Sequence, residues 1–482
     1  MPSNSTAADR ALVSAAALEQ LVTRLRRELP EPCLLTDPAS REVYAYDNSK
    51  RRGLPDLVVL AESHPQVETL LRHCCELDIA VTARGRGSNT TGASIASNGG
   101  VVLSLERMRQ ILEIAPGDRY ARVEAGVLNG DLNQMLRQHA LCWAPDPTSA
   151  PYSSIGGNLA CNAGGPRSVK YGAARDNLLA LRAVDGQGRG FYCGAAVSKL
   201  STGFDLARLL VGSEGSLAII TEATLLLTPV AEAKRGMRAL FDSVEAAASA
   251  VARILAQPIR PCALEFMDGQ ALELVRRRGV ILPDTAGALL LIEVDGRSSE
   301  LDDQCQAIEQ AVRAAPQTGA EHIGLLEFRR APDADALATL WAARKALSPA
   351  LRELAPTKVN EDVVVPVSRL PELVRSVADY GRAAGITVVC FGHAGNGNLH
   401  VNLMFDGNDP QQARAADTCL AQVFARVIEL GGMLSGEHGI GLAKRDFMKS
   451  ALDPITLDLM RRIKTQFDPR GILNPGKLLP PP

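Results

Sequence analysis

Residues 84–92 read Arg-Gly-Arg-Gly-Ser-Asn-Thr-Thr-Gly, and residues 153–165 read Ser-Ser-Ile-Gly-Gly-Asn-Leu-Ala-Cys-Asn-Ala-Gly-Gly. Because glycine lacks a Cβ, backbone N–H groups in such segments can approach an anion, and consecutive N–H groups form a concavity that favours phosphate. Taken alone, either segment could equally be a solvent loop. Neither matches a Rossmann fingerprint or a Walker loop, since the first lacks GxGxxG and neither ends in Gly-Lys-Ser/Thr. The two segments therefore indicate a different nucleotide-binding fold.

The sequence around these segments, from Asp56 to Pro229, alternates strands, helices and glycine-rich turns. Residues 56–62 (DLVVLAE) predict a strand and residues 63–78 (SHPQVETLLRHCCELD) a helix. Pro-Gly-Asp within residues 111–126 and Asp-Gly-Gln-Gly within residues 181–194 each predict a hairpin. A helix in FDLARLLVG and a strand in AIITEATLLLTP close the region. The pattern predicts an α+β or α/β domain.

After Val230 the glycine density falls and strands alternate with helices from RGMRALF through GALLLIEV to TVVCFGH. Residues 298–315 and 333–354 keep apolar side chains at three-to-four spacing, which is typical of helices that cover one face of an antiparallel sheet. A second domain with a weak β-α-β repeat is expected. From about Gly432 the chain returns to loop and helix, and we expect this last part to pack onto the first domain.

Composition limits the classes of function. A chain of 482 residues is expected to hold two or three domains, since one domain usually has roughly 100 to 200 residues. An apolar fraction of 46% and a charged fraction of 22% are typical of a globular protein. With a net charge of -2 and no Lys/Arg run, binding to a nucleic acid or to an anionic membrane is not expected. This charge distribution fits a small-molecule substrate better than a nucleic acid or a membrane.

The spacing of the cysteines concerns cysteine-held metal sites, and the pattern of the N-terminus concerns the location of the protein in the cell. The ten cysteines include no CxxC spacing that would hold zinc or an iron–sulfur cluster. The N-terminal apolar residues are spaced like one face of a helix rather than a secretion signal, and no run reaches the roughly 18 apolar residues of a spanning helix. We therefore expect a cytoplasmic protein without a membrane span, peripheral to the inner membrane only through a partner.

Three of the seven histidines occur late in the chain: His393 and His400 in GHAGNGNLH, and His438 beside Glu437 in GEHGIG. His393 and His400 are seven residues apart, which suits a strand, a glycine loop and a second strand, and Glu437 can add an oxygen ligand. Three protein ligands would leave open positions on the metal for a substrate. The alternative, polar residues in hydrogen-bonded turns, stays open because no HExxH motif is present.

The order of three segments, residues 83–94, 144–172 and 202–225, resembles the FAD-binding domain of the vanillyl-alcohol-oxidase-type flavoproteins. The resemblance is strongest to their branch of FAD-linked D-2-hydroxy acid dehydrogenases, which holds D-lactate dehydrogenase, the glycolate oxidase FAD subunit and D-2-hydroxyglutarate dehydrogenase. It implies an α+β fold with a two-subdomain FAD-binding domain. A ferredoxin-like antiparallel-sheet substrate (cap) domain and a C-terminal helical segment that returns to the FAD domain complete the chain.

The implied boundaries are an N-terminal helical segment at 1–52, an FAD-binding domain at 53–230, a substrate or cap domain at 231–430 and a C-terminal segment at 431–482. Covalent relatives often attach flavin through a histidine in the first loop, where this chain has Ser88, so the resemblance implies non-covalent FAD. The residues it assigns to FAD are Arg84, Gly85, Arg86, Gly87, Ser88, Asn89, Gly92, Ala93, Pro145, Thr148, Ser149, Ser154, Ile155, Gly156, Gly157, Asn158, Ala160, Asn162, Gly164, Gly165, Tyr171, Gly172, Glu214, Gly215, Ile220 and Asn474.

The same resemblance implies roles around the histidines. His393, His400 and Glu437 would bind a divalent metal, zinc in the first place and manganese or iron otherwise, and His438 would be the catalytic base. Arg344 in LWAARKALSPAL would clamp the substrate carboxylate, a task that suits the planar guanidinium. Its alternative is an ordinary exposed helical arginine. The resemblance also implies secondary substrate-binding roles for Lys358 and Asn402.

The implied function is FAD-dependent oxidation of a small D-2-hydroxy acid to the 2-oxo acid, with hydride passing to flavin N5 and the proton to His438. D-lactate, glycolate and D-2-hydroxyglutarate remain open as substrates. Electrons would leave to a quinone, an electron-transfer flavoprotein, a cytochrome or an iron–sulfur subunit, and a homodimer is one option. Two alternatives are a non-catalytic FAD-binding subunit of a glycolate oxidase-type complex, which would lack the metal motif, and a metal hydrolase, which would not need the glycine loops.

Overall fold

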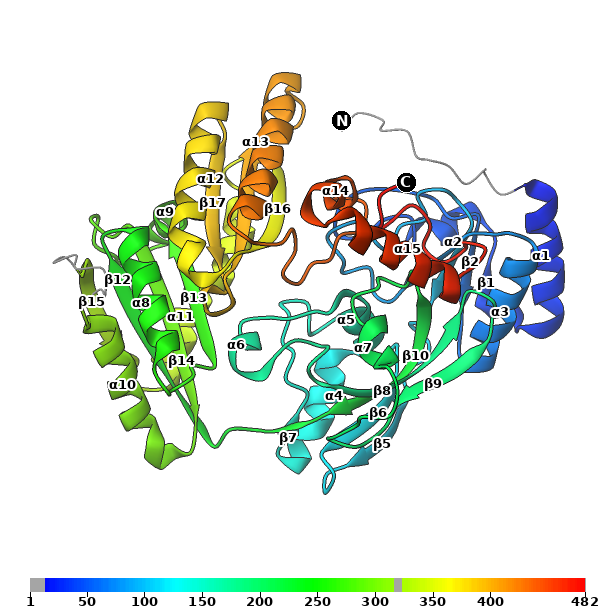
Figure 1. Cartoon of the computed structure of the whole chain (residues 1–482), viewed down its shortest axis with the longest axis horizontal. Helices are drawn as coiled ribbons and strands as arrows, with labels where there is room; N and C mark the ends of the chain where they lie inside the picture. The colour runs from blue at the N-terminus through cyan, green and yellow to red at the C-terminus, as the bar shows by residue number, and fades with distance from the viewer. Residues whose placement is uncertain (1–13, 316–322, 482) are drawn as a thin grey trace. The chain divides into compact units, whose positions relative to one another are not determined.

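A computed structural model describes residues 14–315 and 323–481, so the first thirteen residues of the expected N-terminal segment lie outside the described residues. The chain forms two compact units. The first unit holds the described residues up to Gly165, Gly172–Val230 and the segment from Glu437 onward. The second unit holds Pro166–Tyr171 and Ala231–Gly436. Each unit is built from discontinuous parts of the chain, and each is described by itself (Figure 1).

The first unit begins with a four-stranded sheet in the order β1-β2-β4-β3, in which β2, β4 and β3 are parallel. These strands are short and largely buried, and β2 and β4 are almost wholly apolar, as parallel strands covered by helices usually are, whereas β3 also carries Thr82 and Arg84. The first helix is capped by Ser14, whose side chain accepts the Ala17 N–H. The elements are α1 (Ala15–Glu28), β1 (Leu34–Leu35), α2 (Pro38–Glu42), β2 (Leu57–Leu60), α3 (His64–Glu76), β3 (Val81–Arg84) and β4 (Val101–Ser104).

A five-stranded antiparallel sheet, in the order β5-β6-β10-β8-β9, makes the second part of this unit. Both predicted hairpins are confirmed, since β5 pairs with β6 and β8 pairs with β9 in antiparallel register. The elements are β5 (Ile111–Ala115), β6 (Tyr120–Glu124), α4 (Asn129–Leu136), β7 (Leu141–Cys142), α5 (Ile155–Cys161), β8 (Leu178–Asp185), β9 (Gly190–Gly194), α7 (Leu206–Leu210), β10 (Ala218–Leu226) and β11 (Thr228–Pro229).

The C-terminal segment joins this first unit, as expected from the fold class. It contains α14 (Met448–Ala451) and α15 (Pro454–Phe467), and Leu473 then forms a parallel bridge with Val81 of β3. Buried Asp468 holds the turn after α15 by accepting the backbone N–H groups of Ile472 and Leu473 at 3.0 and 2.7 Å. Strand β3, and therefore the glycine-rich loop that follows it, is supported by the far end of the chain.

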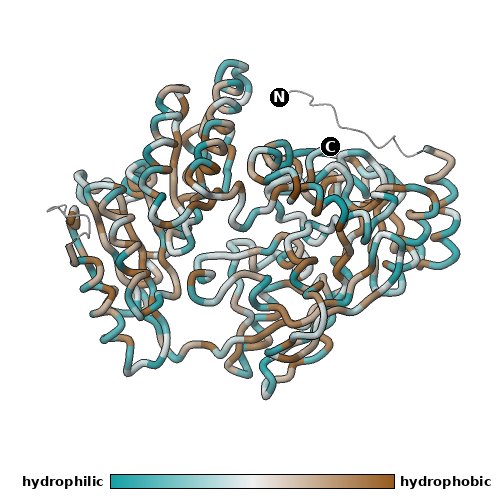
Figure 2. The backbone as a smooth tube through the Cα atoms, viewed as in Figure 1, coloured by the Kyte–Doolittle hydropathy of each residue, from teal (hydrophilic) through white to brown (hydrophobic). Residues whose placement is uncertain are grey.

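The second unit is a seven-stranded antiparallel sheet in the order β15-β12-β14-β13-β17-β18-β16. Its inner strands are buried on both faces and mostly apolar, and Figure 2 colours much of this sheet as hydrophobic, but they also carry buried polar residues such as Glu265, Glu293 and His400. The strands are β12 (Ala233–Phe241), β13 (Ala263–Asp268), β14 (Ala288–Gly296), β15 (Leu325–Arg330), β16 (Thr357–Val364), β17 (Thr387–Gly392) and β18 (Asn398–Phe405). Segment α6 (Ser168–Tyr171) also belongs to this unit.

Helices cover both faces of this sheet, so the expectation that residues 298–315 and 333–354 share one face was wrong. Leu289 and Leu291 of β14 pack with α9 and α11, whereas α8, α10, α12 and α13 lie on the opposite face (Figure 1). Helical periodicity shows which side of a helix is buried, but not which face of a sheet it meets. The helices are α8 (Val244–Ala256), α9 (Gly269–Arg277), α10 (Leu301–Arg313), α11 (Ala334–Leu351), α12 (Leu370–Ala384) and α13 (Pro410–Glu429).

The architecture agrees with the α+β fold class expected from the sequence. Among the helices of residues 14–315 and 323–481, none has both the length and the apolar character needed to cross a bilayer.

Candidate functional site

His393, His400 and Glu437 form one group in which a possible ligand atom of each lies within 4.8 Å of the others. His393 follows β17 and His400 lies in β18, so the short turn between these strands brings the two imidazoles together. Their rings lie edge to face with centroids 5.2 Å apart. Both histidines are buried, with exposed fractions of 7% and 8%, so they are built into the sheet rather than left in solvent, whereas Glu437 is partly buried.

The turn that connects the two histidines requires glycine at residue 397. Gly397 has a φ of +69°, and a Cβ there would lie 1.9 Å from the Val365 carbonyl oxygen. Only glycine combines this left-handed backbone with so close an approach.

Glu437 is placed by the residues before it in the chain. Asp362 of β16 is fully buried and accepts the Gly436 N–H at 2.9 Å and the Ser435 hydroxyl at 3.1 Å. In the β16–β18 register Asp362 lies opposite His400. The carboxylate of Asp362 therefore fixes the peptide that leads into Glu437 beside the strand that carries His400.

Glu265 links the histidines to Arg344. This β13 carboxylate is fully buried, lies 2.5 Å from His393 Nδ1 and accepts a hydrogen bond from Arg344 Nε at 2.9 Å. Burial acts to raise the pKa of Glu265, but the nearby His393 and Arg344 lower it, and the net shift is downward. Arg344 comes from α11, its side chain is 12% exposed, and its guanidinium lies over the Phe391 ring at 4.5 Å. It is not an ordinary exposed helical arginine.

The other predicted substrate residues lie on β16 and β18. The register pairs Lys358 with Met404, Asn360 with Asn402 and Asp362 with His400, so these side chains share one face of the sheet. Asn402 donates both amide hydrogens to backbone oxygens, of Val389 at 3.1 Å and of His400 at 3.3 Å. Within the described residues its Oδ1 has no hydrogen-bond donor. Any substrate contact by Asn402 would therefore use that oxygen as an acceptor.

The donor set of the group fits a divalent metal. Two imidazoles and one carboxylate are ligands that zinc, manganese and iron accept, and three protein ligands leave positions for a substrate. The contact between His393 Nδ1 and Glu265 leaves Nε2 as the ligand atom, which is the usual arrangement of metal-bound histidines.

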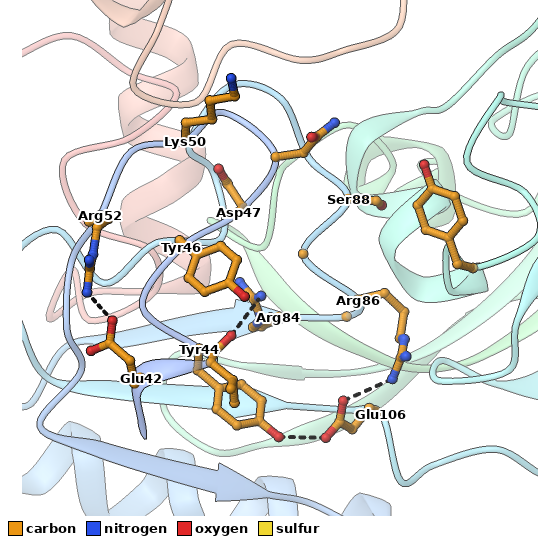
Figure 3. A pocket seen from close by; sticks show the side chains of 15 residues that line it. Glu42, Tyr44, Tyr46, Asp47, Lys50, Arg52, Arg84, Arg86, Ser88 and Glu106 are labelled. Atoms are coloured by element: carbon orange, nitrogen blue, oxygen red, sulfur yellow. Dashed lines mark hydrogen bonds and ion pairs between the residues drawn. The ribbon is translucent and has the colours of Figure 1, made fainter. Parts of the chain in front are cut away.

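In the first unit, the loop after β3 borders a cavity of about 760 Å³ (Figure 3). Glycine permits two close approaches in this loop. A Cβ on Gly85 would lie 2.4 Å from the Ser154 hydroxyl, and Gly87, with a φ of +65°, leaves room for the Arg84 guanidinium. The cavity is lined by Glu42, Val43, Tyr44, Tyr46, Asp47, Asn48, Lys50, Arg52, Arg84, Gly85, Arg86, Gly87, Ser88, Glu106 and Tyr152.

Charges on the cavity wall are partly paired. Figure 3 shows Arg86 on Glu106, which also accepts the Tyr44 hydroxyl, and Arg52 on Glu42. Arg84 is 7% exposed, and burial lowers the pKa of its guanidinium.

Buried donors in this unit fit an anionic, carbonyl-bearing cofactor such as FAD. Within the described residues, Arg84 Nη1, Asn158 Nδ2 and the Ser153 and Ser216 hydroxyls are buried without a hydrogen-bond partner. Leaving such groups unsatisfied costs about 1–3 kcal/mol each, so they are expected to meet a ligand or water. Three of them lie in or beside the glycine-rich segments, where phosphate or flavin oxygens could accept their hydrogens.

Several predicted cofactor residues support the local backbone. The Ser154 side chain caps α5 by accepting the Gly157 N–H, and Asn162, with a φ of +53°, ends the same helix. Buried Glu214 accepts the backbone N–H groups of Ile440 and Gly441, so its carboxylate binds the C-terminal segment. Asn89 Nδ2 donates to the His438 carbonyl oxygen at 3.3 Å. These contacts give Asn162 and Glu214 a structural role in the unit.

The structure places one predicted cofactor residue elsewhere. Tyr171 belongs to the second unit, where its hydroxyl donates to Asp295 at 2.7 Å. The remaining ones lie in the first unit: Gly92, Ala93, Pro145, Thr148, Ser149, Ile155, Gly156, Ala160, Gly164, Gly165, Gly172, Gly215, Ile220 and Asn474.

Two carboxylates at the site were not predicted from the sequence, Glu265 and Asp362. Glu265 is an acid inside a strand whose residues Ala263–Asp268 are all buried. An acidic residue within an apolar strand is a usable signal, because a buried carboxylate needs a partner. Asp362 ends a less apolar run and carries no comparable signal.

Comparison with known proteins is consistent with this geometry. Residues 55–194 match the family described as FAD binding domain, and residues 230–478 match FAD linked oxidases, C-terminal domain.

Among curated proteins, the chain is 36% identical to the glycolate oxidase subunit GlcD of Bacillus subtilis, over 91% of this chain and 92% of that protein. It is 34% identical to the D-lactate dehydrogenase of Anaerostipes hadrus, over 95% and 97% of the two chains. Among solved structures, p-cresol methylhydroxylase matches with a TM-score of 0.81 at 15% identity, over 97% of this chain and 98% of that one. The 4-ethylphenol oxidase from Gulosibacter chungangensis matches with a TM-score of 0.76 at 19% identity, over 98% and 99%. These two likenesses concern the fold.

Proposed function

This chain belongs to the FAD-linked oxidases, in the branch of D-2-hydroxy acid dehydrogenases, and we propose that it oxidises a small D-2-hydroxy acid at a metal-assisted site. The observation that carries the proposal is the group His393, His400 and Glu437, joined through Glu265 to the buried Arg344. A metal site beside a fixed guanidinium can hold the hydroxyl and the carboxylate of one 2-hydroxy acid.

Each residue of the proposed site has a separate role in the reaction. Arg344 binds the substrate carboxylate, and His438, which follows Glu437 in the chain, accepts the hydroxyl proton. When bound, FAD supplies the hydride acceptor and a divalent cation on the triad, with zinc preferred over manganese or iron, supplies a Lewis acid for the hydroxyl. Removal of the C2 hydride and the hydroxyl proton converts the 2-hydroxy acid into the 2-oxo acid. Lys358 and Asn402 contact the rest of the substrate.

The proposed division of the chain follows the same logic. Residues 53–230 and 431–482 hold FAD, and residues 231–430 hold substrate and supply the metal ligands His393 and His400. The third metal ligand, Glu437, and the base, His438, come from the C-terminal segment 431–482. FAD is proposed to be non-covalent because Ser88 stands in the loop where a tethering histidine would be. Electrons leave to a separate acceptor, a quinone, electron-transfer flavoprotein, cytochrome or iron–sulfur subunit. Support comes from the Bacillus subtilis relative, which is named a subunit.

Anaerobic flavin bleaching tests the function. The purified flavoprotein, loaded with Zn²⁺ or Mn²⁺, is mixed with glycolate, D-lactate, L-lactate or D-2-hydroxyglutarate, and flavin absorbance is followed. We expect one D-2-hydroxy acid to bleach the flavin and L-lactate to leave it oxidised. If none of the four acids reduces the flavin while dithionite does, the chain is a flavin-binding subunit of another activity and the proposal fails.

A further inference from the structure

Glu265 is a buried charge that the proposed chemistry does not use. Its carboxylate lies in the middle of β13, is fully buried, and has one oxygen on His393 Nδ1 and the other on Arg344 Nε. A buried ionised carboxylate is costly unless each oxygen has a partner. Here one carboxylate serves a predicted metal ligand and a predicted substrate clamp, which come from different elements.

The contact with His393 selects the state of its imidazole. An ionised carboxylate can only accept, so Nδ1 carries the hydrogen and Nε2 keeps its lone pair. A histidine held in this way is oriented and made more basic as a metal ligand, and removing its partner typically lowers metal affinity about 10- to 100-fold.

The contact with Arg344 fixes the guanidinium from one side. Nε is bound to Glu265, and the planar group lies over Phe391, so the remaining N–H groups have a defined direction. An arginine anchored through Nε keeps its terminal nitrogens for a second, bidentate carboxylate.

We propose that Glu265 is a positioning residue that holds the metal ligand His393 and the substrate clamp Arg344 in one fixed arrangement. The inference rests on the proposed function for the roles of those two residues. Because both depend on one carboxylate, loss of Glu265 weakens metal binding and substrate binding together, although Glu265 itself touches neither ligand.

Three variants test the proposal: Glu265→Gln removes the charge, Glu265→Asp keeps the charge but shortens the reach, and Glu293→Gln is the matched control. Glu293 lies on the neighbouring strand β14, is 2% exposed and accepts the indole N–H of Trp341 at 2.8 Å, but does not bond His393 or Arg344. Zn²⁺ affinity is measured by calorimetry on each flavin-loaded protein after removal of metal by chelation, and KM and kcat are measured with the preferred hydroxy acid.

We expect Glu265→Gln to lower Zn²⁺ affinity about 10- to 100-fold and Glu265→Asp to lower it less. KM for the hydroxy acid should rise about tenfold in Glu265→Gln, which corresponds to one weakened charged hydrogen bond. Saturating Zn²⁺ should restore kcat but leave KM raised, because metal refilling does not restore the anchor of Arg344. Glu293→Gln should keep the parental Zn²⁺ affinity and KM, and all variants should keep their flavin.

Parental Zn²⁺ affinity and KM in both Glu265 variants would overturn the inference, as would an equal loss in Glu293→Gln. Should Glu265→Gln fail to fold, the Glu265→Asp result decides. The Zn²⁺ measurement needs no substrate. A loss of Zn²⁺ affinity in a protein that no 2-hydroxy acid reduces therefore keeps the positioning role and rejects the proposed function.

Discussion

His438 is proposed to act as base, while His393 and His400 are proposed to hold the metal, and single substitutions separate these roles. In His393→Ala and His400→Ala, metal should be lost while FAD stays bound, because the glycine-rich segments proposed to hold FAD lie in the other unit. His438→Ala should keep metal and flavin but lose turnover, and a positioned base is worth about 10²- to 10⁴-fold in rate. Metal analysis and stopped-flow flavin reduction measure both effects.

Two results would contradict these assignments. If His438→Ala reduces its flavin at the parental rate, the base is another residue. If His393→Ala and His400→Ala keep full metal occupancy, the group is an ordinary hydrogen-bonded turn.

Arg344 makes a second prediction at this scale. Arg344→Ala should raise KM about 10- to 100-fold, the range expected for a lost charged hydrogen bond, with a smaller change in kcat. Arg344→Lys should restore binding only in part, because an ammonium cannot bond Glu265 and a bidentate carboxylate in the same plane. Steady-state kinetics with the preferred hydroxy acid give the split.

Arg238→Lys is the matched control for Arg344→Lys. Arg238 is about equally buried, with a side chain 13% exposed, and it pairs with Glu327 rather than with the site. Equal effects of the two lysine variants would mean that the KM change reports general destabilisation.

At the scale of residues, the sequence predicted groups that stand out by type and spacing. The histidines of GHAGNGNLH and the Glu437–His438 pair fall in this class. The supporting carboxylates were harder to find, because Glu265 meets His393 across strands more than a hundred residues apart in the chain. Pairing between distant strands depends on topology, which no local pattern contains.

At the scale of elements, the residue that caps the N-terminus of α9 predicts how the stability of the protein depends on pH. Asp268 caps this helix by accepting the Ala271 N–H at 2.8 Å and also accepts the Cys390 N–H at 2.8 Å. Burial raises the pKa of Asp268 from 3.8 to about 7, although these hydrogen bonds lower it. The folded protein therefore holds this proton more tightly than the unfolded chain, so stability is lost as pH rises from about 4 through about 7.

Asp268→Asn removes this titration and retains the shape of the cap. Between pH 5 and pH 8 the parent should lose Tm by a few degrees relative to Asp268→Asn, as scanning calorimetry would show. The matched control is Asp409→Asn, which replaces the cap of α13, where hydrogen bonds lower the pKa of Asp409 and the residue is partly exposed. Its Tm difference from the parent should stay flat over this range. A flat difference for Asp268→Asn as well would show that Asp268 is ionised throughout.

Local elements were predicted well where the signal was local. The hairpins at Pro-Gly-Asp and Asp-Gly-Gln-Gly are present because the turn residues and the alternating strands act together. The faces of the second sheet were not predictable, because both faces of β14 are apolar and offer no preference to α10 or α11.

At the scale of the whole molecule, the first unit includes the C-terminal segment from Glu437 onward. The family resemblance anticipated this return, whereas composition alone shows only a proline-rich tail. Asn474 connects the C-terminal segment to the rest of the unit. Its side-chain amide donates to the Ala93 and Glu214 carbonyl oxygens at 2.9 and 2.7 Å, and its side-chain oxygen accepts from Lys477 at 2.6 Å. Lys477 is 4% exposed, and burial lowers its pKa to about 7.

Asn474→Ala should therefore release FAD and lower the Tm of the first unit. The change leaves two buried carbonyl oxygens without their donor, at about 1–3 kcal/mol each, directly under the glycine-rich loop. Asn474 also has a φ of +46°, where alanine is strained, so Asp78→Ala is the control: Asp78 has a φ of +57° and is exposed in the same unit. Flavin content after gel filtration and calorimetry compare the two. If Asn474→Ala keeps its full flavin and loses no more Tm than Asp78→Ala, the chain end covers the unit without organising the cofactor loop.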